Sequence, residues 1–230
     1  ISRGFETLNS GRNYFMLIIT PSEREKEPLS GFIPHHKIYV CGIGRVNTAS
    51  FITEEIIIRR PDRVLLVGCA GAYQGSGLCI GDIAVAQSEF SADEGLADKT
   101  GIRTMQEIGI PVIEKGDNKY FNLFPVDQVL ADRIYESARS EGLTAQKGRF
   151  ATVSAASGTV ERARMVNKRI NALCENMEGA AAAHVCLKYA IPFAEIRGIS
   201  NVAGQRRPFD IVSAMSAAAR VLRRFLADDR

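Results

Sequence analysis

Several residue types are absent or rare in this chain, and each absence argues against a class of protein. Tryptophan is absent, aromatic residues make up 7% of the chain, and only three histidines occur. His35 and His36 are adjacent and His184 stands alone, which is not the spacing of a zinc site, so we expect no metal. No apolar run is long enough to span a bilayer, and the polar N-terminus lacks the apolar segment of a signal peptide.

Charge and cysteine usage narrow the class further. The formal net charge is +3, and basic residues occur only in short pairs, so we expect neither a nucleic-acid nor a membrane partner. The five cysteines are an odd number without a C-x-x-C pair, and most of them lie in apolar segments. This usage is typical of a reducing compartment, so we expect a cytoplasmic protein.

Short apolar runs alternate along the chain with longer helical patterns. The runs that we expect to form strands are 14–20, 37–43, 63–68, 82–87, 149–154 and 193–200. Because these runs lack strict alternation, we expect a mixed or parallel sheet that helices cover on both faces. The 230 residues suit one α/β domain over 14–230, preceded by a polar extension over 1–13.

Five segments have helical patterns, and a middle segment has no regular pattern. The expected helices are 47–60, 126–142, 158–169, 178–190 and 210–229. We expect Asn47 to cap the first of them. The last has one apolar stripe, formed by Ile211, Met215, Ala218, Leu222 and Phe225. Residues 88–125 are expected to be irregular and to form a lid or an interface.

Glycines, acids and amides follow the expected strands, where α/β proteins bind their ligands. These segments are 20–27, 42–49, 68–77, 173–184 and 197–207. Each has a structural explanation by itself, because glycines suit tight turns, acids suit helix starts and charged runs suit solvated turns. Their recurrence at successive strand ends favours a binding site.

The order of motifs along the chain resembles that of the nucleoside phosphorylase/hydrolase superfamily. The motifs are P-S-x-x-E, G-I-G-R-V, V-G-C-A-G-A, G-D-I-A-V-A, E-N-M-E-G-A-A-A-A-H and R-G-I-S-N. Within the superfamily the chain is similar to the 5′-methylthioadenosine/S-adenosylhomocysteine nucleosidases. Its "GAYQGSGL", "ATVSAASGT" and "RGISNVAG" segments resemble the futalosine hydrolases. The resemblance implies a three-layer α/β/α sandwich with a mixed central sheet, no cofactor, and a homo-oligomer (a dimer or larger).

The reaction implied by the resemblance is hydrolysis of the N-ribosidic bond of a purine nucleoside, an N-glycosyl hydrolase activity. Glu25 corresponds to the carboxylate that activates water, with Glu23 as the alternative, and Arg197 corresponds to the arginine that orients the water. Glu178 matches the glutamate that accepts hydrogen bonds from the ribose hydroxyls, and Met177 would pack on the sugar.

Other positions depart from the nucleosidase pattern or are implied to line the substrate site. Cys69 stands where those nucleosidases usually have serine, and Asn176 stands where many have an acid. The resemblance also places Ala70, Gly71, Ser154, Phe209 and Arg206 at the substrate. Arg206 or Arg207 is a candidate for binding a carboxylate on the 5′ group of futalosine, although a solvated loop explains this pair equally well.

Asn201 stands where the methylthioadenosine nucleosidases have aspartate. Its amide can donate to O6 of hypoxanthine and accept from a protonated N7, whereas a carboxylate would repel O6 unless protonated. The amide therefore predicts a 6-oxopurine substrate, and the resemblance implies that this substrate is futalosine, on the menaquinone pathway. Three alternatives stay open: a methylthioadenosine/S-adenosylhomocysteine nucleosidase, a phosphate-dependent purine nucleoside phosphorylase using Arg45, and a non-catalytic nucleoside-binding protein.

Overall fold

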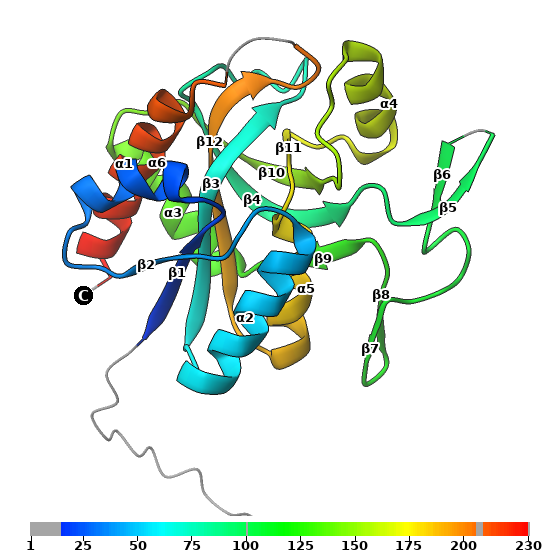
Figure 1. Ribbon diagram of the computed structural model, residues 1–230, viewed down its shortest axis with the longest axis horizontal. Helices are drawn as coiled ribbons and strands as arrows, with labels where there is room; N and C mark the ends of the chain where they lie inside the picture. The colour runs from blue at the N-terminus through cyan, green and yellow to red at the C-terminus, as the bar shows by residue number, and fades with distance from the viewer. Residues whose placement is uncertain (1–14, 100, 206–208, 230) are drawn as a thin grey trace, which may run out of the picture.

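The computed structural model describes residues 15–99, 101–205 and 209–229 (Figure 1). The helices are α1 (Glu23–Phe32), α2 (Arg45–Arg59), α3 (Gln128–Ser140), α4 (Val160–Ile170), α5 (Gly179–Tyr189) and α6 (Ile211–Ala227). The first six strands are β1 (Met16–Thr20), β2 (Ile38–Val40), β3 (Arg63–Ala72), β4 (Ile83–Ser91), β5 (Gly95–Asp98) and β6 (Gly101–Thr104). The remaining strands are β7 (Ile113–Lys115), β8 (Asn118–Tyr120), β9 (Leu123–Pro125), β10 (Ala145–Thr152), β11 (Cys174–Asn176) and β12 (Phe193–Val202).

A mixed sheet of eight strands forms the centre of the molecule. Its order is β11-β10-β4-β12-β3-β1-β2, with β9 paired to β4. Most pairs are parallel, whereas β12 and β9 run antiparallel to β4, and β11 runs antiparallel to β3. Because β11 pairs with both β10 and β3, the strands from β11 to β3 close into a ring.

Helices cover the sheet on both sides. Helices α1, α3 and α6 pack together on one side, while α2 and α5 pack together on the other (Figure 1). The three-layer α/β/α sandwich with a mixed central sheet is therefore confirmed. On the stripe expected for α6, Met215, Ala218, Leu222 and Phe225 are buried and Ile211 is partly buried.

All six expected strands are present, but β10 begins earlier than its apolar run, at Ala145, and three others continue past the carboxyl ends of theirs. Strand β3 continues to Ala72, β4 to Ser91 and β12 to Val202. As a result, Asn201 lies inside β12 and not beyond the end of a strand. Its backbone pairs with Gly71 of β3, so its position is set by the sheet and not by a turn.

The expected cap at Asn47 is wrong. Helix α2 is preceded by Gly44, which has a φ of 90° and forms its N-cap. Asn47 lies inside the first turn, and its side-chain Nδ2 donates to the carbonyl of Ile43 at 2.8 Å. Glycine takes the cap position because other residues rarely adopt a positive φ.

Residues 88–125 are more regular than expected. After β4 the chain forms two hairpins, β5–β6 and β7–β8, and then β9, and the hairpins extend away from the central sheet in Figure 1. Only Gly116 and Asp117 separate β7 from β8. A Gly-Asp pair between two strands is a hairpin signal, which the scarcity of apolar residues in this segment obscures.

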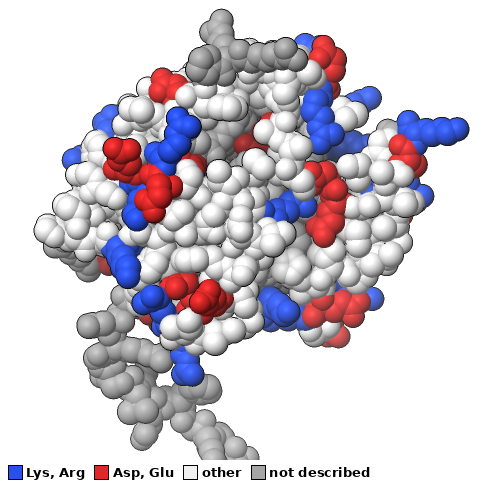
Figure 2. All heavy atoms as spheres, viewed as in Figure 1, with Lys and Arg blue, Asp and Glu red and all other residues white. Residues whose placement is uncertain are grey.

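The surface carries charge of both signs. On the face seen in Figure 2, acidic and basic side chains are interspersed and not separated by sign. Of the helices in the described ranges, none is both long and apolar enough to cross a membrane.

Candidate active site

A cavity of about 590 Å³ opens at the carboxyl ends of the central strands. Of the twelve residues expected to act on or bind substrate, ten line it: Glu25, Cys69, Ala70, Gly71, Asn176, Met177, Glu178, Arg197, Asn201 and Phe209. They come from segments far apart in the sequence. The parallel arrangement of β1, β3 and β12 brings their ends to one edge of the sheet.

Glu25 is held in the cavity wall by α1. Ser22 is the N-cap of this helix, and its hydroxyl donates to Glu25 Oε2 at 2.6 Å. The N–H of Cys69 donates to Glu25 Oε1 at 2.8 Å. Burial raises the pKa of Glu25 above its ordinary value, and the two hydrogen bonds and Arg197 oppose this effect. The carboxylate is therefore fixed in place and suited to accept a proton.

Helix α1 itself was not expected from the sequence. The charged run Glu23–Glu27 suits a solvated turn by itself, yet the Ser22-x-x-Glu25 spacing before it is one that also starts helices. Glu23 projects outward and pairs with Lys26 at 3.3 Å. The geometry brings Glu25, and not Glu23, to the cavity.

Arg197 is 1% exposed and is held by groups on three sides. Its Nε donates to Glu195 Oε1 at 2.7 Å, and its Nη1 donates to the carbonyl of Cys69 at 3.0 Å. Its Nη2 lies 3.2 Å from Glu178 Oε2. The guanidinium is thereby fixed between the strand end of β3 and the start of α5.

Glu178 lies at the N-cap of α5 and is 3% exposed. The N–H of Gly44 donates to its Oε1 at 2.9 Å, and the N–H of Met177 donates to its Oε2 at 3.3 Å. Two carboxylate oxygens that face a cavity can accept hydrogen bonds from two neighbouring hydroxyls. This arrangement suits the expected ribose contact.

Cys69 contributes to the site through its backbone. Its N–H contacts Glu25 and its carbonyl contacts Arg197, so one residue of β3 connects the two side chains. Burial and the neighbouring Glu25 carboxylate raise the pKa of its thiol. The thiol therefore stays neutral and is unsuited to act as a nucleophile.

Asn176 has its amide directed into the protein. Its Oδ1 accepts from the N–H groups of Glu178 and Gly179 at 2.9 and 2.7 Å, and its Nδ2 donates to Glu89 Oε1 at 2.8 Å. An acid at this position would lack the donor that Glu89 receives. Asn176 thus orients the first turn of α5, although part of it also lines the cavity.

Asn201 lines the cavity next to Gly71. The hydroxyl of Ser200 donates to Asn201 Oδ1 at 3.0 Å. The Nδ2 group has no assigned partner among the described residues, and a Cβ on Gly71 would lie 3.1 Å from it. The amide therefore presents its NH₂ donor, and its oxygen retains a second lone pair.

Two of the expected substrate contacts are not found in the cavity wall. Ser154 is exposed, and its N–H donates to Asp93 Oδ2 at 2.6 Å. Its neighbours Val153, Ala156 and Ser157 line the cavity instead. Arg206 lies outside the described residues, as does Arg207. Phe209 borders the cavity mouth with 61% of its surface exposed.

Sequence reasoning missed Glu175, which holds the cavity-lining segment around Ser157 in place. Its Oε1 accepts from the N–H of Ser157 at 2.7 Å. Its Oε2 accepts from the hydroxyls of Ser157 and Tyr73 at 2.7 and 3.0 Å. Glu175 belongs to the E-N-M-E-G motif, but its direction depends on the short strand β11, which has no apolar signal.

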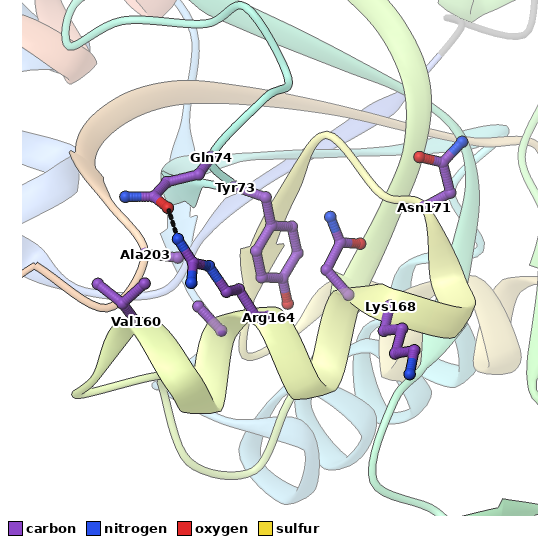
Figure 3. A pocket seen from close by; sticks show the side chains of 9 residues that line it. Tyr73, Gln74, Val160, Arg164, Lys168, Asn171 and Ala203 are labelled. Carbon is purple, nitrogen blue, oxygen red and sulfur yellow. Dashed lines mark hydrogen bonds between the residues drawn. The ribbon is translucent and has the colours of Figure 1, made fainter.

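A second cavity, of about 360 Å³, lies between α4 and the segment that follows β3. Figure 3 shows Arg164 extending from α4 to Gln74, where its Nη2 donates to Oε1 at 3.5 Å. None of the described residues expected for catalysis lines this cavity.

In the parts of the chain that the structure describes, no group of three or more His, Cys, Asp or Glu side chains is arranged to hold a metal ion.

Comparison with known sequences gives one family. The family model described as the phosphorylase superfamily matches residues 31–227. A futalosine hydrolase of Thermus thermophilus is 38% identical over 190 residues, which are 82% of this chain and 80% of that protein. A 5′-methylthioadenosine/S-adenosylhomocysteine nucleosidase of Geobacillus kaustophilus is 29% identical, with 78% and 72% covered.

Solved structures share the fold at low identity. A Helicobacter pylori methylthioadenosine nucleosidase variant with 5′-methylthioadenosine in its active site matches with a TM-score of 0.79 and 19% identity, covering 94% of this chain and 100% of that one. The native futalosine hydrolase of Helicobacter pylori matches with a TM-score of 0.74 and 20% identity, covering 93% and 97%. At these identities the likeness concerns the fold alone.

Proposed function

The chain belongs to the phosphorylase superfamily, and on this premise we propose that it is an N-glycosyl hydrolase acting on futalosine. The products would be hypoxanthine and dehypoxanthine futalosine, on the menaquinone pathway. The observation that carries the proposal is the orientation of Asn201, whose carbonyl accepts from Ser200 and whose NH₂ is available to the cavity. The 38% identity to a futalosine hydrolase supports the same choice.

In the proposed reaction, Glu25 removes a proton from a water molecule that attacks C1′ of the ribose. The bond between C1′ and the purine breaks, and a proton from solvent reaches N7 of the leaving base. Arg197 orients the water, and Glu178 accepts hydrogen bonds from the ribose hydroxyls. The held geometry of Glu25 and Arg197 on either side of Cys69 supports these roles.

At the base, Asn201 donates to O6 and accepts from the N7–H that forms as the bond breaks. Hypoxanthine offers O6 as an acceptor, whereas adenine offers a 6-amino donor that would face the NH₂ of the amide. A site built to satisfy one hydrogen-bonding pattern discriminates strongly against the opposite one. This reasoning favours a 6-oxopurine over methylthioadenosine.

Hydrolysis is favoured over phosphorolysis by the pairing of Arg45. Its Nη2 forms an ion pair with Asp93 and donates to the carbonyl of Thr152 at 2.9 Å. The neighbouring N–H of Gly44 donates to Glu178. A phosphate ion would need these groups to be free and would meet the Glu178 carboxylate. Arg24 also borders the cavity, but it is exposed to solvent.

The test is a panel of futalosine, inosine, methylthioadenosine and S-adenosylhomocysteine, assayed for free base. We expect release of hypoxanthine from futalosine and very little release of adenine from methylthioadenosine or S-adenosylhomocysteine. The rate should be the same with and without phosphate in the buffer. Preference for methylthioadenosine, or a requirement for phosphate, would contradict the proposal. Binding of futalosine without release of base would identify a non-catalytic nucleoside-binding protein.

A homo-oligomer and a cytoplasmic location are further parts of the proposal. Helix α2 carries Val46, Ile57 and Ile58 on its outer surface, and each is at least 63% exposed. Ile57 and Ile58 border a surface groove with Ala49 and Thr53. Exposed apolar side chains of this kind favour burial against a second copy of the chain. Light scattering on the purified protein measures its mass, and a monomer at micromolar concentration would contradict this part.

A further inference from the structure

Two glutamates with no assigned role lie behind the active site, and both are fully buried. Glu89 comes from β4 and Glu195 from β12, and each has 0% of its surface exposed. Their carboxyl groups meet at Gly179, the first residue of α5. A Cβ placed on Gly179 would collide with Glu89 Oε1 and Glu195 Oε2, so the two oxygens converge on one point.

The hydrogen bonds of this pair are incomplete unless one carboxyl carries a proton. Glu195 Oε1 accepts from Arg197 Nε at 2.7 Å, whereas Oε2 is buried and has no donor among the described residues. Glu89 receives hydrogen bonds only from neutral groups, with Thr152 Oγ1 at 2.7 Å and Asn176 Nδ2 at 2.8 Å. A proton on Glu89 would supply the donor that Glu195 Oε2 lacks.

The charges around the pair favour the same state. Arg197 is the cation that Glu25, Glu178 and Glu195 share. Among the described residues Glu89 forms no ion pair with a cation, and Cys174 beside it is a buried thiol whose pKa is raised. Burial and the neighbouring Glu195 raise the pKa of Glu89 well above its ordinary value, and this effect outweighs the opposing effects of the Thr152 hydrogen bond and the Arg197 charge. A fourth buried negative charge would be costly, because Arg197 is already shared by three carboxylates.

We propose that Glu89 is a positioning residue of the active site: as a neutral carboxylic acid it donates a hydrogen bond to Glu195 and so holds Arg197 in its catalytic orientation. Glu89 also accepts from Asn176, the residue that orients the first turn of α5 and hence Glu178. One buried acid therefore connects the arginine on β12 to the ribose-binding glutamate on α5. Glu89 is not among the residues that line the cavity, so it acts only through these neighbours.

The protonation state is tested without any substrate. Infrared spectroscopy at neutral pH distinguishes a protonated carboxyl group from a carboxylate by its carbonyl stretching band. We expect one protonated-carboxyl band in the wild-type protein that is lost in Glu89→Gln and unchanged in Glu55→Gln, which alters a buried glutamate on α2. Identical spectra for wild type and Glu89→Gln would overturn the proposal.

The positioning role is tested by comparing two substitutions of Glu89. Glu89→Gln keeps a neutral donor near Glu195, whereas Glu89→Met removes the donor at similar volume. Because a lost hydrogen bond to a charged group costs roughly 10- to 100-fold in rate, we expect Glu89→Met to lower kcat by about that factor with little change in KM. Glu89→Gln should recover most of this loss, since it restores the donor.

This proposal rests on the proposed function only for the choice of substrate in the assay. The outcomes therefore distinguish a failure of the positioning role from a failure of the proposed function. If the wild type cleaves a nucleoside other than futalosine, the same comparison is made with that nucleoside. Equal losses in Glu89→Gln and Glu89→Met would overturn the positioning role, because an ionised base or simple packing would then explain Glu89. Equal activity of Glu89→Met and wild type would overturn it as well. Thermal unfolding of both variants identifies any loss of kcat that merely follows a loss of folded protein.

Discussion

Asn201 is paired with Gly71, whereas Ile199, two residues earlier on β12, is paired with Ala70, the immediate neighbour of Gly71 on β3. Strand β12 therefore contains one extra residue, Ser200, and forms a β-bulge beside the cavity. In a regular pairing Ser200 would lie opposite Gly71 and Asn201 opposite Ala72. Bulges re-aim side chains beside active sites. Here the bulge also places the Ser200 hydroxyl where it donates to Asn201 Oδ1.

The first prediction concerns base selection by Asn201. Asn201→Asp replaces the NH₂ donor with a carboxylate oxygen that repels O6 of hypoxanthine and can accept a hydrogen bond from the 6-amino group of adenine. We expect the ratio of the futalosine rate to the methylthioadenosine rate to fall by a factor on the order of 10² or more. Asn118→Asp, on the exposed hairpin strand β8, is the matched control. An unchanged ratio would show that Asn201 does not select the base.

A second prediction concerns the proton acceptor. Glu25→Gln preserves the shape of the side chain but cannot take a proton from water. We expect kcat to fall by about 10²- to 10⁴-fold while substrate binding is retained, as measured by steady-state kinetics and calorimetry. Glu23→Gln, which alters the exposed partner of Lys26, should have near-normal kcat. The reverse result would transfer the role to Glu23.

The pH dependence of the reaction gives a third prediction. Glu25 must be ionised to act, so kcat/KM falls as the pH decreases through its pKa, which burial raises above the ordinary glutamate value. The Ser22 hydroxyl stabilises the ionised form. Ser22→Ala removes this hydrogen bond, so the pKa of Glu25 rises and the acid limb of the profile moves to higher pH. Ser30→Ala on the exposed face of α1 is the control, and a limb unmoved in Ser22→Ala would refute the assignment.

The fourth prediction uses a glycine of β3. A Cβ on Gly68 would lie 2.5 Å from Arg197 Nη1 and 3.0 Å from Glu25 Oε1. Gly68→Ala must therefore displace both side chains, and we expect a loss of kcat on the order of 10²-fold or more. Gly31→Ala on α1 meets no atom within 4 Å and should leave kinetics unchanged. Normal activity in Gly68→Ala would argue against the Glu25–Arg197 arrangement.

The elements that could be predicted from the sequence are those with a strong local signal. Apolar, β-branched runs identify β1, β3 and β12, and the 3.6-residue stripe identifies α6. Elements without such a signal were missed. Strand β11 has only three residues, and the hairpin strands β5 to β8 are mostly exposed. The Ser22-x-x-Glu25 spacing at the start of α1 is a helix-start signal, but the charged residues around it resemble a solvated turn.

The sequence by itself determined the alternation of strands and helices and the set of polar residues at the strand ends. Parallel strands bring their carboxyl ends to one edge, so such residues gather without further information. Only the tertiary structure decided where each side chain points. Asn176 faces Glu89, Cys69 acts through its backbone, and Asn201 is re-aimed by the Ser200 bulge. These outcomes depend on the register between strands that lie far apart in the chain, and on partners that no local pattern specifies.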